Sequence, residues 1–543
     1  PVEEFFKKSS FEQIKISPDG RHIAAIVPLE FESSLVIMDI DSKKITGSFK
    51  PSADTYIGEF YWVNATRVLF TTGIKRGRNE QASWSGAWYA MNADGTQVGK
   101  GYATDYKAAI LDTLKEDDKL VLVQYRGDTG YETYGFMNVY NGDIRPTHKK
   151  APDANYGEYF SDNNADVRLY QSNKTYKDTK FYGRKDKDAS WDLIYDQKNT
   201  GQSITYMGFS ADNSIAYFSM SEKTGPNGLY AYNFNTGEFK LVIKDKNVDP
   251  GRLVSAPDSD VVYAIRYYDG FPRYEILDKT NPMVKDLAKL QSAFPDTDVV
   301  PVSSTLDGRK VVYVVRSDTQ AGDYYLFDRD AQKAEHLVSS KAWLEPKQMA
   351  MMEPMKFKAR DGLEIEVFVT LPRGSNGKNL PMILNPHGGP FGVDDQWGFN
   401  PEVQLLANRG YAVLQVNYRG SSNYGKSFME AGYEQWGKAM QDDLTDATRW
   451  AIQQGIADPN RICMYGASYG AYASLMGAAK EPSLYRCAAG NVGTYDLALQ
   501  LNYSTNGGGQ SNGLKTFYSD VAQENVEQVS PARLAGNIKI PVF

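Results

Sequence analysis

The chain has 543 residues, enough for two or more domains that each have a hydrophobic core. Hydrophobic residues make up 41% of it and charged residues 23%, as in soluble globular proteins. The net charge of -7 argues against nucleic acid or an anionic membrane as the main partner, and no apolar run is long enough for a membrane span. The sequence leaves open whether the protein is cytoplasmic or exported, periplasmic or secreted, and whether it forms a homo-oligomer.

Residues 1–345 contain a repeated pattern. After a short helix expected over residues 2–8, a polar turn with Asp or Asn is followed by a β-branched or aromatic strand. Such copies begin roughly every 50 residues, at Ser17, Trp62, Leu114, Asp162, Ser210, Ala256 and Thr305. Seven copies at this period predict a seven-bladed β-propeller of four-stranded blades. An array of β-sandwiches is the alternative, but sandwiches show no such fixed period.

Residues 346–543 follow the pattern of an α/β domain. Two alternating strands on either side of the Asp361-Gly362 turn predict an antiparallel pair. Short apolar strands then alternate with helices expected near 403–409 and over 441–455. In the second helix Leu444, Ala447, Trp450 and Ala451 share one face. This alternation predicts a mostly parallel sheet with helices on both faces.

Residues 461–479, RICMYGASYGAYASLMGAA, have the strand, sharp turn and helix of a nucleophile elbow. Ser468 occupies the apex, between Gly466 and Gly470. We expect neighbouring backbone to crowd those two positions, where only glycine avoids a clash. The elbow would expose the Ser468 hydroxyl and direct the Tyr469 N–H toward the place where an oxyanion forms.

A second glycine-rich turn, His387-Gly388-Gly389-Pro390, directly follows a predicted strand. Two successive glycines allow the backbone to approach a reacting centre closely and direct an N–H at it. We therefore predict that Gly388 or Gly389 supplies the second oxyanion donor.

Beyond these local patterns, the chain resembles the prolyl oligopeptidase family of serine peptidases over nearly its whole length. The matching phrases are NPHGGP, VNYRGSSNYGKSF, DDLTDATRWAI, YGASYGAYAS and SPARLAGNIKIPV. HGGP and GASYGAYAS look most like the acylaminoacyl peptidase and dipeptidyl-peptidase branch. The resemblance implies a propeller (1–345) and an α/β-hydrolase domain (346–543), which hydrolyses short peptides through an acyl-enzyme on Ser468. The propeller would limit substrate size, and no cofactor or metal is implied.

The same resemblance implies further roles near Ser468. Val492 and Tyr495, in NVGTYD, would wall the pocket for the residue before the cut bond. Arg419, in NYRG, would have a structural role in holding loops near the site.

The family pattern also places an Asp shortly after the strand IKIPV and a His further on. The sequence reaches Phe543 within that strand, and its histidines, at positions 22, 148, 336 and 387, all precede Ser468. We therefore expect the hydrolase domain to be incomplete and the 543-residue chain alone to be almost inactive. His387 is the rival candidate for the base, although the loop's chemistry calls for backbone donors there.

Two other functions are open at this stage. A carboxylesterase uses the same elbow and glycine loop, although it seldom needs a size filter as large as a propeller. A non-catalytic propeller protein with a degenerate hydrolase domain would explain the missing histidine but not the intact elbow.

The two cysteines, Cys463 and Cys487, fall in predicted core strands. We interpret them as buried free thiols, and a single disulfide is the alternative if their two strands are neighbours.

Overall fold

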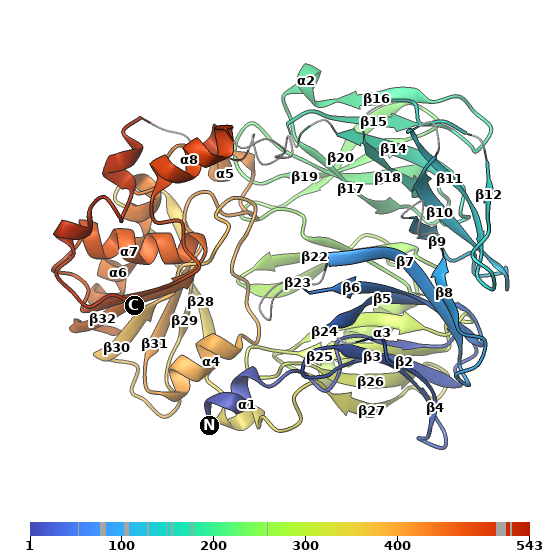
Figure 1. Ribbon diagram of the computed structural model, residues 1–543, viewed down its shortest axis with the longest axis horizontal. Helices are drawn as coiled ribbons and strands as arrows, with labels where there is room; N and C mark the ends of the chain where they lie inside the picture. The colour runs from blue at the N-terminus through green and yellow to red at the C-terminus, as the bar shows by residue number, and fades with distance from the viewer. Residues whose placement is uncertain are drawn as a thin grey trace.

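The computed structural model describes residues 1–52, 54–75, 83–102, 108–127, 130–147, 149–153, 156–173, 175, 177–257, 259–506, 517, 519–521 and 524–543. Figure 1 shows two domains side by side, with a ring of small sheets on the right and an α/β layer structure on the left. No helix in the described part of the chain is long and apolar enough to cross a membrane.

The ring consists of seven antiparallel sheets, which confirms the predicted seven-bladed propeller. Each sheet is formed by consecutive strands, so every blade is a local unit of the sequence. The blades are β1–β4 (Ile14–Ile16, His22–Pro28, Ser33–Asp39, Ile45–Phe49), β5–β8 (Thr55–Asn64, Arg67–Ile74, Ser83–Asn92, Gly99–Tyr102), β9–β12 (Ala109–Asp112, Leu120–Arg126, Glu132–Asn138, Ile144–Pro146), β13–β16 (Gly157–Ser161, Val167–Asn173, Thr179–Gly183, Asp192–Asp196), β17–β20 (Ile204–Phe209, Ile215–Met220, Gly228–Asn233, Glu238–Lys244), β21–β23 (Arg252–Ser255, Val262–Asp269, Phe271–Ile276) and β24–β27 (Asp298–Ser304, Lys310–Arg316, Asp323–Asp328, Lys333–Ser339).

The sixth blade differs from the predicted four-stranded pattern. It has three strands, and the chain after β23 forms helix α3 (Met283–Ala293). Met283, Leu287 and Leu290 recur at helical spacing and are buried in the core shared by the sixth and seventh blades. A fourth strand is therefore replaced by an amphipathic helix. Another short helix, α2 (Gln197–Thr200), follows β16.

The ring closes through side-chain packing between its first and last blades. Ile14 and Ile16 of β1 share a buried cluster with Val312 of β25. The backbone N–H of Ile16 donates to Ser303 Oγ over 3.0 Å, and that of Leu306 donates to Pro18 O over 2.9 Å. No strand is exchanged between these blades, since β1–β4 and β24–β27 form separate sheets.

The second domain has a six-stranded sheet in the order β28-β29-β31-β30-β32-β33. β28 and β29 are antiparallel, β29 pairs antiparallel with β31, and the remaining pairs are parallel, as the sequence predicts. The strands are β28 (Met352–Lys358), β29 (Glu364–Thr370), β30 (Leu380–Leu384), β31 (Ala412–Val416), β32 (Ala457–Ala467) and β33 (Cys487–Asn491). The helices are η1 (Pro346–Gln348), α4 (Pro401–Asn408), α5 (Lys426–Glu430), α6 (Ala439–Gln453), α7 (Tyr469–Lys480), α8 (Leu497–Asn506), η2 (Val526–Val529) and η3 (Ala535–Asn537).

The main hydrophobic core lies between this sheet and its helices. Leu444, Ala447 and Ala451 of α6 are fully buried or nearly so, and Trp450 packs at the edge of the same cluster. Burial on this face explains why the predicted amphipathic helix forms.

The two domains contact each other through loops and through the N-terminal helix. Helix α1 (Val2–Phe6) packs against α4 of the second domain. The Asn423 side chain donates to Tyr268 O over 2.7 Å, and the Met352 N–H donates to the Asp318 carboxylate over 2.6 Å. The predicted boundary at residues 345 and 346 lies between β27 and β28, and it stays a prediction.

Candidate active site

Ser468 lies at a strained turn between β32 and α7. Its backbone has φ 55° and ψ -118°, a conformation that residues other than glycine adopt only when the surrounding structure imposes it. The Ser468 N–H donates to Asn491 O over 2.9 Å, and the Ser468 carbonyl accepts from the Ala471 and Tyr472 N–H groups. These bonds hold the turn in place while the residue itself stays exposed. The strand, turn and helix are those expected from the sequence.

Glycine at positions 466 and 470 is required by close approach of the backbone. A Cβ on Gly470 would lie 2.1 Å from Pro386 O, and a Cβ on Gly466 would lie 2.8 Å from the same atom. Both distances are shorter than any normal carbon–oxygen contact, so a side chain would displace the loop that follows β30. The strand-turn-helix therefore presses directly against the His387-Gly388-Gly389 turn.

This contact places the glycine turn beside Ser468. A Cβ on Gly388 would lie 3.4 Å from Ser468 Cβ and 3.3 Å from Ala467 O. Gly389 has φ 111°, which favours glycine. The backbone N–H groups of Tyr469, Gly388 and Gly389 have no acceptor among the described residues. The arrangement has the donors and the closeness that an oxyanion hole requires.

The side chain of Tyr469 has a different environment from its N–H. It is fully buried, and burial raises the pKa of its hydroxyl well above the ordinary value. The phenol therefore stays protonated in the core. Its ring packs edge-on against Trp436, with centroids 4.6 Å apart.

The His387 ring orders the glycine turn. Nδ1 lies 2.7 Å from Gly388 O, and Nε2 lies 3.0 Å from Ser421 Oγ. The ring stacks on Tyr418, with centroids 4.4 Å apart. Because both ring nitrogens have partners in the loops, this arrangement does not present His387 to Ser468 as a base.

Arg419 joins three segments near the site. Its Nε and Nη2 donate to Asp443 of α6 over 2.8 and 2.7 Å, and its Nη1 lies 2.8 Å from Asp361 in the β28–β29 turn. Asp443 is buried, and desolvation raises the pKa of its carboxyl. Hydrogen bonds to the two carboxylates raise the pKa of Arg419, so it stays charged. These contacts agree with the structural role expected of Arg419.

A small cavity of about 130 Å³ opens beside Ser468. Its described lining combines the apolar Trp436, Leu497 and Phe517 with the polar Thr494 and Gln500. Val492, which is 79% exposed, and Tyr495 do not line this cavity. Their assignment to the substrate pocket stays a prediction.

Sequence reasoning missed most of the described pocket residues, and Trp436 is the largest of them. It lies in the irregular segment between α5 and α6, where no periodicity indicates which side chains face a site. An unexplained tryptophan among glycines, GYEQWGKA, is the one indication that the sequence offered.

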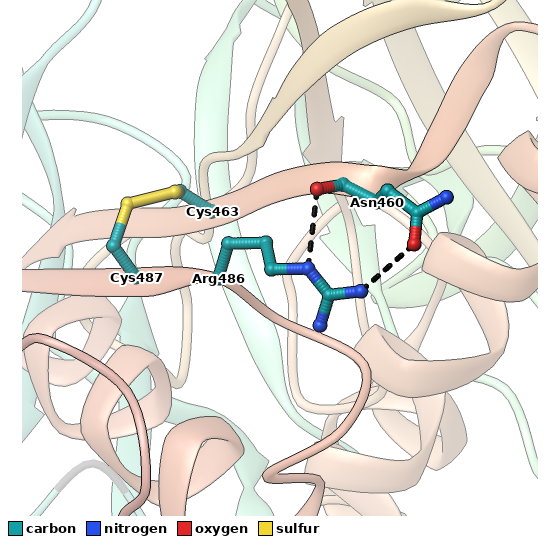
Figure 2. Close-up of a disulfide and its surroundings, with 4 residues drawn as sticks. All are labelled: Asn460, Cys463, Arg486 and Cys487. Carbon is teal, nitrogen blue, oxygen red and sulfur yellow. Dashed lines mark hydrogen bonds between the residues drawn. A yellow bond between two sulfur atoms is a disulfide. The ribbon is translucent and has the colours of Figure 1, made fainter.

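The free-thiol interpretation of the cysteines is wrong. Cys463 of β32 and Cys487 of β33 form a disulfide, with Cα atoms 4.7 Å apart (Figure 2). The two strands are parallel neighbours whose register pairs these two residues. Arg486, next to the disulfide, donates from Nε and Nη2 to the carbonyl and side-chain oxygens of Asn460. The disulfide therefore joins β32, the strand directly before Ser468, to β33, the strand that ends at Asn491.

The fold and this site together define a two-domain protein, a β-propeller joined to an α/β-hydrolase domain with a serine elbow and a facing glycine turn.

The model of the prolyl oligopeptidase family matches residues 397–537, within the hydrolase domain. Dipeptidyl aminopeptidase BIII of Pseudoxanthomonas mexicana is 33% identical over 303 residues, which are 54% of this chain and 43% of that protein. Dipeptidyl peptidase family member 6 of Caenorhabditis elegans is 24% identical over 534 residues, 92% of this chain and 71% of that protein. A solved structure from a study of two prolyl endopeptidases has a TM-score of 0.69 at 15% identity, covering 98% of this chain and 79% of its own. The expected family resemblance is confirmed.

Proposed function

We propose that the protein is a serine peptidase that hydrolyses short peptides through an acyl-enzyme on Ser468. The Ser468 hydroxyl loses its proton to a base and attacks the peptide carbonyl carbon. The carbonyl oxygen then becomes an oxyanion, which the N–H groups of Tyr469 and of Gly388 or Gly389 stabilise. Collapse of this intermediate releases the amine, and water hydrolyses the acyl-enzyme.

One observation supports this proposal above the others: the strained, exposed Ser468 lies in contact distance of a glycine turn whose N–H groups are unpaired among the described residues. A binding protein has no need of this strain. The test is to treat the full-length protein with a fluorophosphonate and locate the adduct by mass spectrometry. An adduct on Ser468 is expected, and an adduct elsewhere with full activity in Ser468→Ala would exclude the proposal.

Peptides are favoured over simple esters because of the propeller. Its axis contains a cavity of about 780 Å³, lined by the first strands of several blades. We propose that the propeller admits short peptides and excludes folded proteins. Comparing turnover of a short peptide amide and of an acyl ester with the same acyl group distinguishes a peptidase from a carboxylesterase.

The apolar side chains of Trp436, Leu497 and Phe517 in the cavity lining support a preference for an apolar residue before the cut bond. A series of short peptides that differ only at this residue measures the preference. A strong preference for charged residues there would contradict the assignment of the cavity.

The low turnover expected of residues 1–543 alone stays a prediction. Loss of the base in a comparable triad costs about a million-fold in turnover. The test compares peptide hydrolysis by a polypeptide of residues 1–543 with that by the full-length protein. Equal rates would place the base within residues 1–543.

The disulfide is relevant to the cellular compartment in which the protein acts. Disulfides persist in oxidising surroundings and are reduced in the cytosol, so we propose that the protein acts in an exported, oxidising environment. Labelling thiols in the denatured protein directly after cell lysis tests this. Labelled Cys463 and Cys487 would contradict it.

A further inference from the structure

The cavity on the propeller axis is strongly basic at one place. Five of the seven charged residues in its described lining are basic. Lys115 is paired with Asp260 over 2.6 Å, and burial raises the pKa of the nearby Asp112. The other basic side chains of the lining include three arginines of the sixth and seventh blades, Arg252, Arg266 and Arg316.

Strand pairing brings these arginines together. Arg252 of β21 is opposite Arg266 of β22, and Arg316 of β25 is opposite Asp298 of β24. Arg266 and Arg316 both donate to Asp298 Oδ2, and Tyr274 donates to Asp298 Oδ1 over 3.0 Å. The single carboxylate of Asp298 therefore pairs with two guanidinium groups, and Arg252 lies on the strand beside one of them.

Donors remain after these contacts. Arg316 uses its Nε on Asp298, and no partner among the described residues occupies its terminal nitrogens, while its side chain is 46% exposed. Arg252 is exposed, and its side chain has no hydrogen bond or ion pair with the described residues. Arg266 is buried, and its Nε lacks a hydrogen-bond partner. Two arginines paired with one carboxylate, next to the unpaired charge of Arg252, leave an excess of positive charge among the described residues, so an anion in this cavity would stabilise the cluster.

The cluster lies at the end of the propeller that faces the hydrolase domain. Tyr268, two residues after Arg266, accepts a hydrogen bond from Asn423 through its carbonyl. Asp318, two residues after Arg316, accepts one from the Met352 N–H. A ligand held by the arginines would therefore lie at the hydrolase-facing end of the cavity.

We propose that Arg252 and Arg316, supported by Arg266, form a binding site for a carboxylate of a peptide that enters the propeller. The planar guanidinium fork matches a carboxylate through paired N–H donors. The carboxylate comes either from the peptide C-terminus or from an acidic side chain. The identity of the ligand as a peptide rests on the proposed peptidase function, whereas the anion site rests on the arginines alone.

The test measures binding by calorimetry in full-length Ser468→Ala protein, so that turnover does not interfere. Three probes are compared: tetra-alanine with a free C-terminus, its C-terminal amide, and the amide with one alanine replaced by glutamate. We expect one or both acidic probes to bind roughly tenfold more tightly than the neutral amide, as charged hydrogen bonds require. Which acidic probe is preferred identifies the source of the carboxylate.

Variants then assign the preference to residues. Arg252→Gln and Arg316→Gln should each reduce it, and the double variant should abolish it while binding the neutral amide unchanged. Arg309→Gln is the matched control, because Arg309 is an exposed arginine of the seventh blade that pairs with Asp307 and Asp330 outside the cavity. Equal affinity for all three probes, or a preference that survives in the double variant, would overturn the proposal. A preserved preference without fluorophosphonate labelling of Ser468 in the wild-type protein would refute the peptidase and retain the anion site.

Discussion

Replacing Gly470 by alanine should separate the elbow from the proposed oxyanion donors. The new Cβ would lie 2.1 Å from Pro386 O and 3.1 Å from Pro386 C. Since carbon–oxygen contacts in proteins are at least about 3.0 Å, the carbonyl has to retreat by about 1 Å. Gly388 is only two residues further along and moves with it. A displacement of about 1 Å costs roughly a hundredfold in rate, and complete loss of one donor costs about 100- to 1,000-fold.

The assay is the rate of fluorophosphonate labelling of Ser468, together with kcat/KM for a short peptide amide. We expect both to fall by about 100-fold or more, with a loss of about 1–3 kcal/mol in the free energy of unfolding from overpacking. Circular dichroism and thermal unfolding establish that the variant is folded.

A graded series of alanine variants makes the result specific. A Cβ on Gly466 would come no closer than 2.7 Å to its neighbours, so Gly466→Ala should show a smaller loss than Gly470→Ala. A Cβ on Gly536 would meet nothing within 4 Å, so Gly536→Ala should behave as wild type. If folded Gly470→Ala were labelled within twofold of the wild-type rate, the inferred contact between elbow and glycine turn would not position the donors.

Four further predictions follow from the site and its supports. Ser468→Ala should lower turnover by about a million-fold and abolish labelling, with an unchanged melting temperature; residual labelling at another serine would contradict the assignment. Arg419→Gln should cost about 3–5 kcal/mol at neutral pH, because it leaves the Asp443 carboxylate buried without its cation. Burial already raises the pKa of Asp443 in the folded state, so its contribution to stability is present at low pH and is lost as pH rises through that pKa. The loss in Arg419→Gln should therefore shrink in acid, and urea unfolding across pH checks this against wild type and Arg419→Gln/Asp443→Asn. The Cys463→Ala/Cys487→Ala variant should lose about 3 kcal/mol, since the disulfide spans 24 residues, and reductant should destabilise wild type but not the variant. Short peptides should be cleaved and a folded protein should not, which gel electrophoresis and mass spectrometry detect; rapid internal cleavage of the folded protein would contradict the size filter.

Much of the architecture was determined by local sequence patterns. The seven polar turns from Ser17 to Thr305 predict seven blades because each blade is a contiguous unit whose strands alternate within one sheet. The elbow at Ser468 could also be predicted, because its strand, glycines and helix lie within twenty residues and its geometry depends on φ and ψ at the turn.

Sequence periodicity was insufficient to predict the secondary structure of a segment that could form either a strand or a helix. The repeat predicted a fourth strand in every blade, but Met283, Leu287 and Leu290 instead form the buried face of α3. Packing against the seventh blade favours a helix over a fourth strand. This packing is a tertiary contact, which the local sequence pattern does not include.

Contacts between distant residues were decided by tertiary structure alone. Cys463 and Cys487 form a disulfide because β32 and β33 are parallel neighbours in one register, which no count of cysteines can establish. His387 orders a loop because Ser421, 34 residues away, meets its ring. The pocket at Ser468 takes Trp436 from the segment between α5 and α6 and Phe517 from beyond α8, and the arginine cluster needs two blades. Local sequence sets φ, ψ and hydrophobic period, whereas the folding of the chain on itself sets which distant side chains share a cavity.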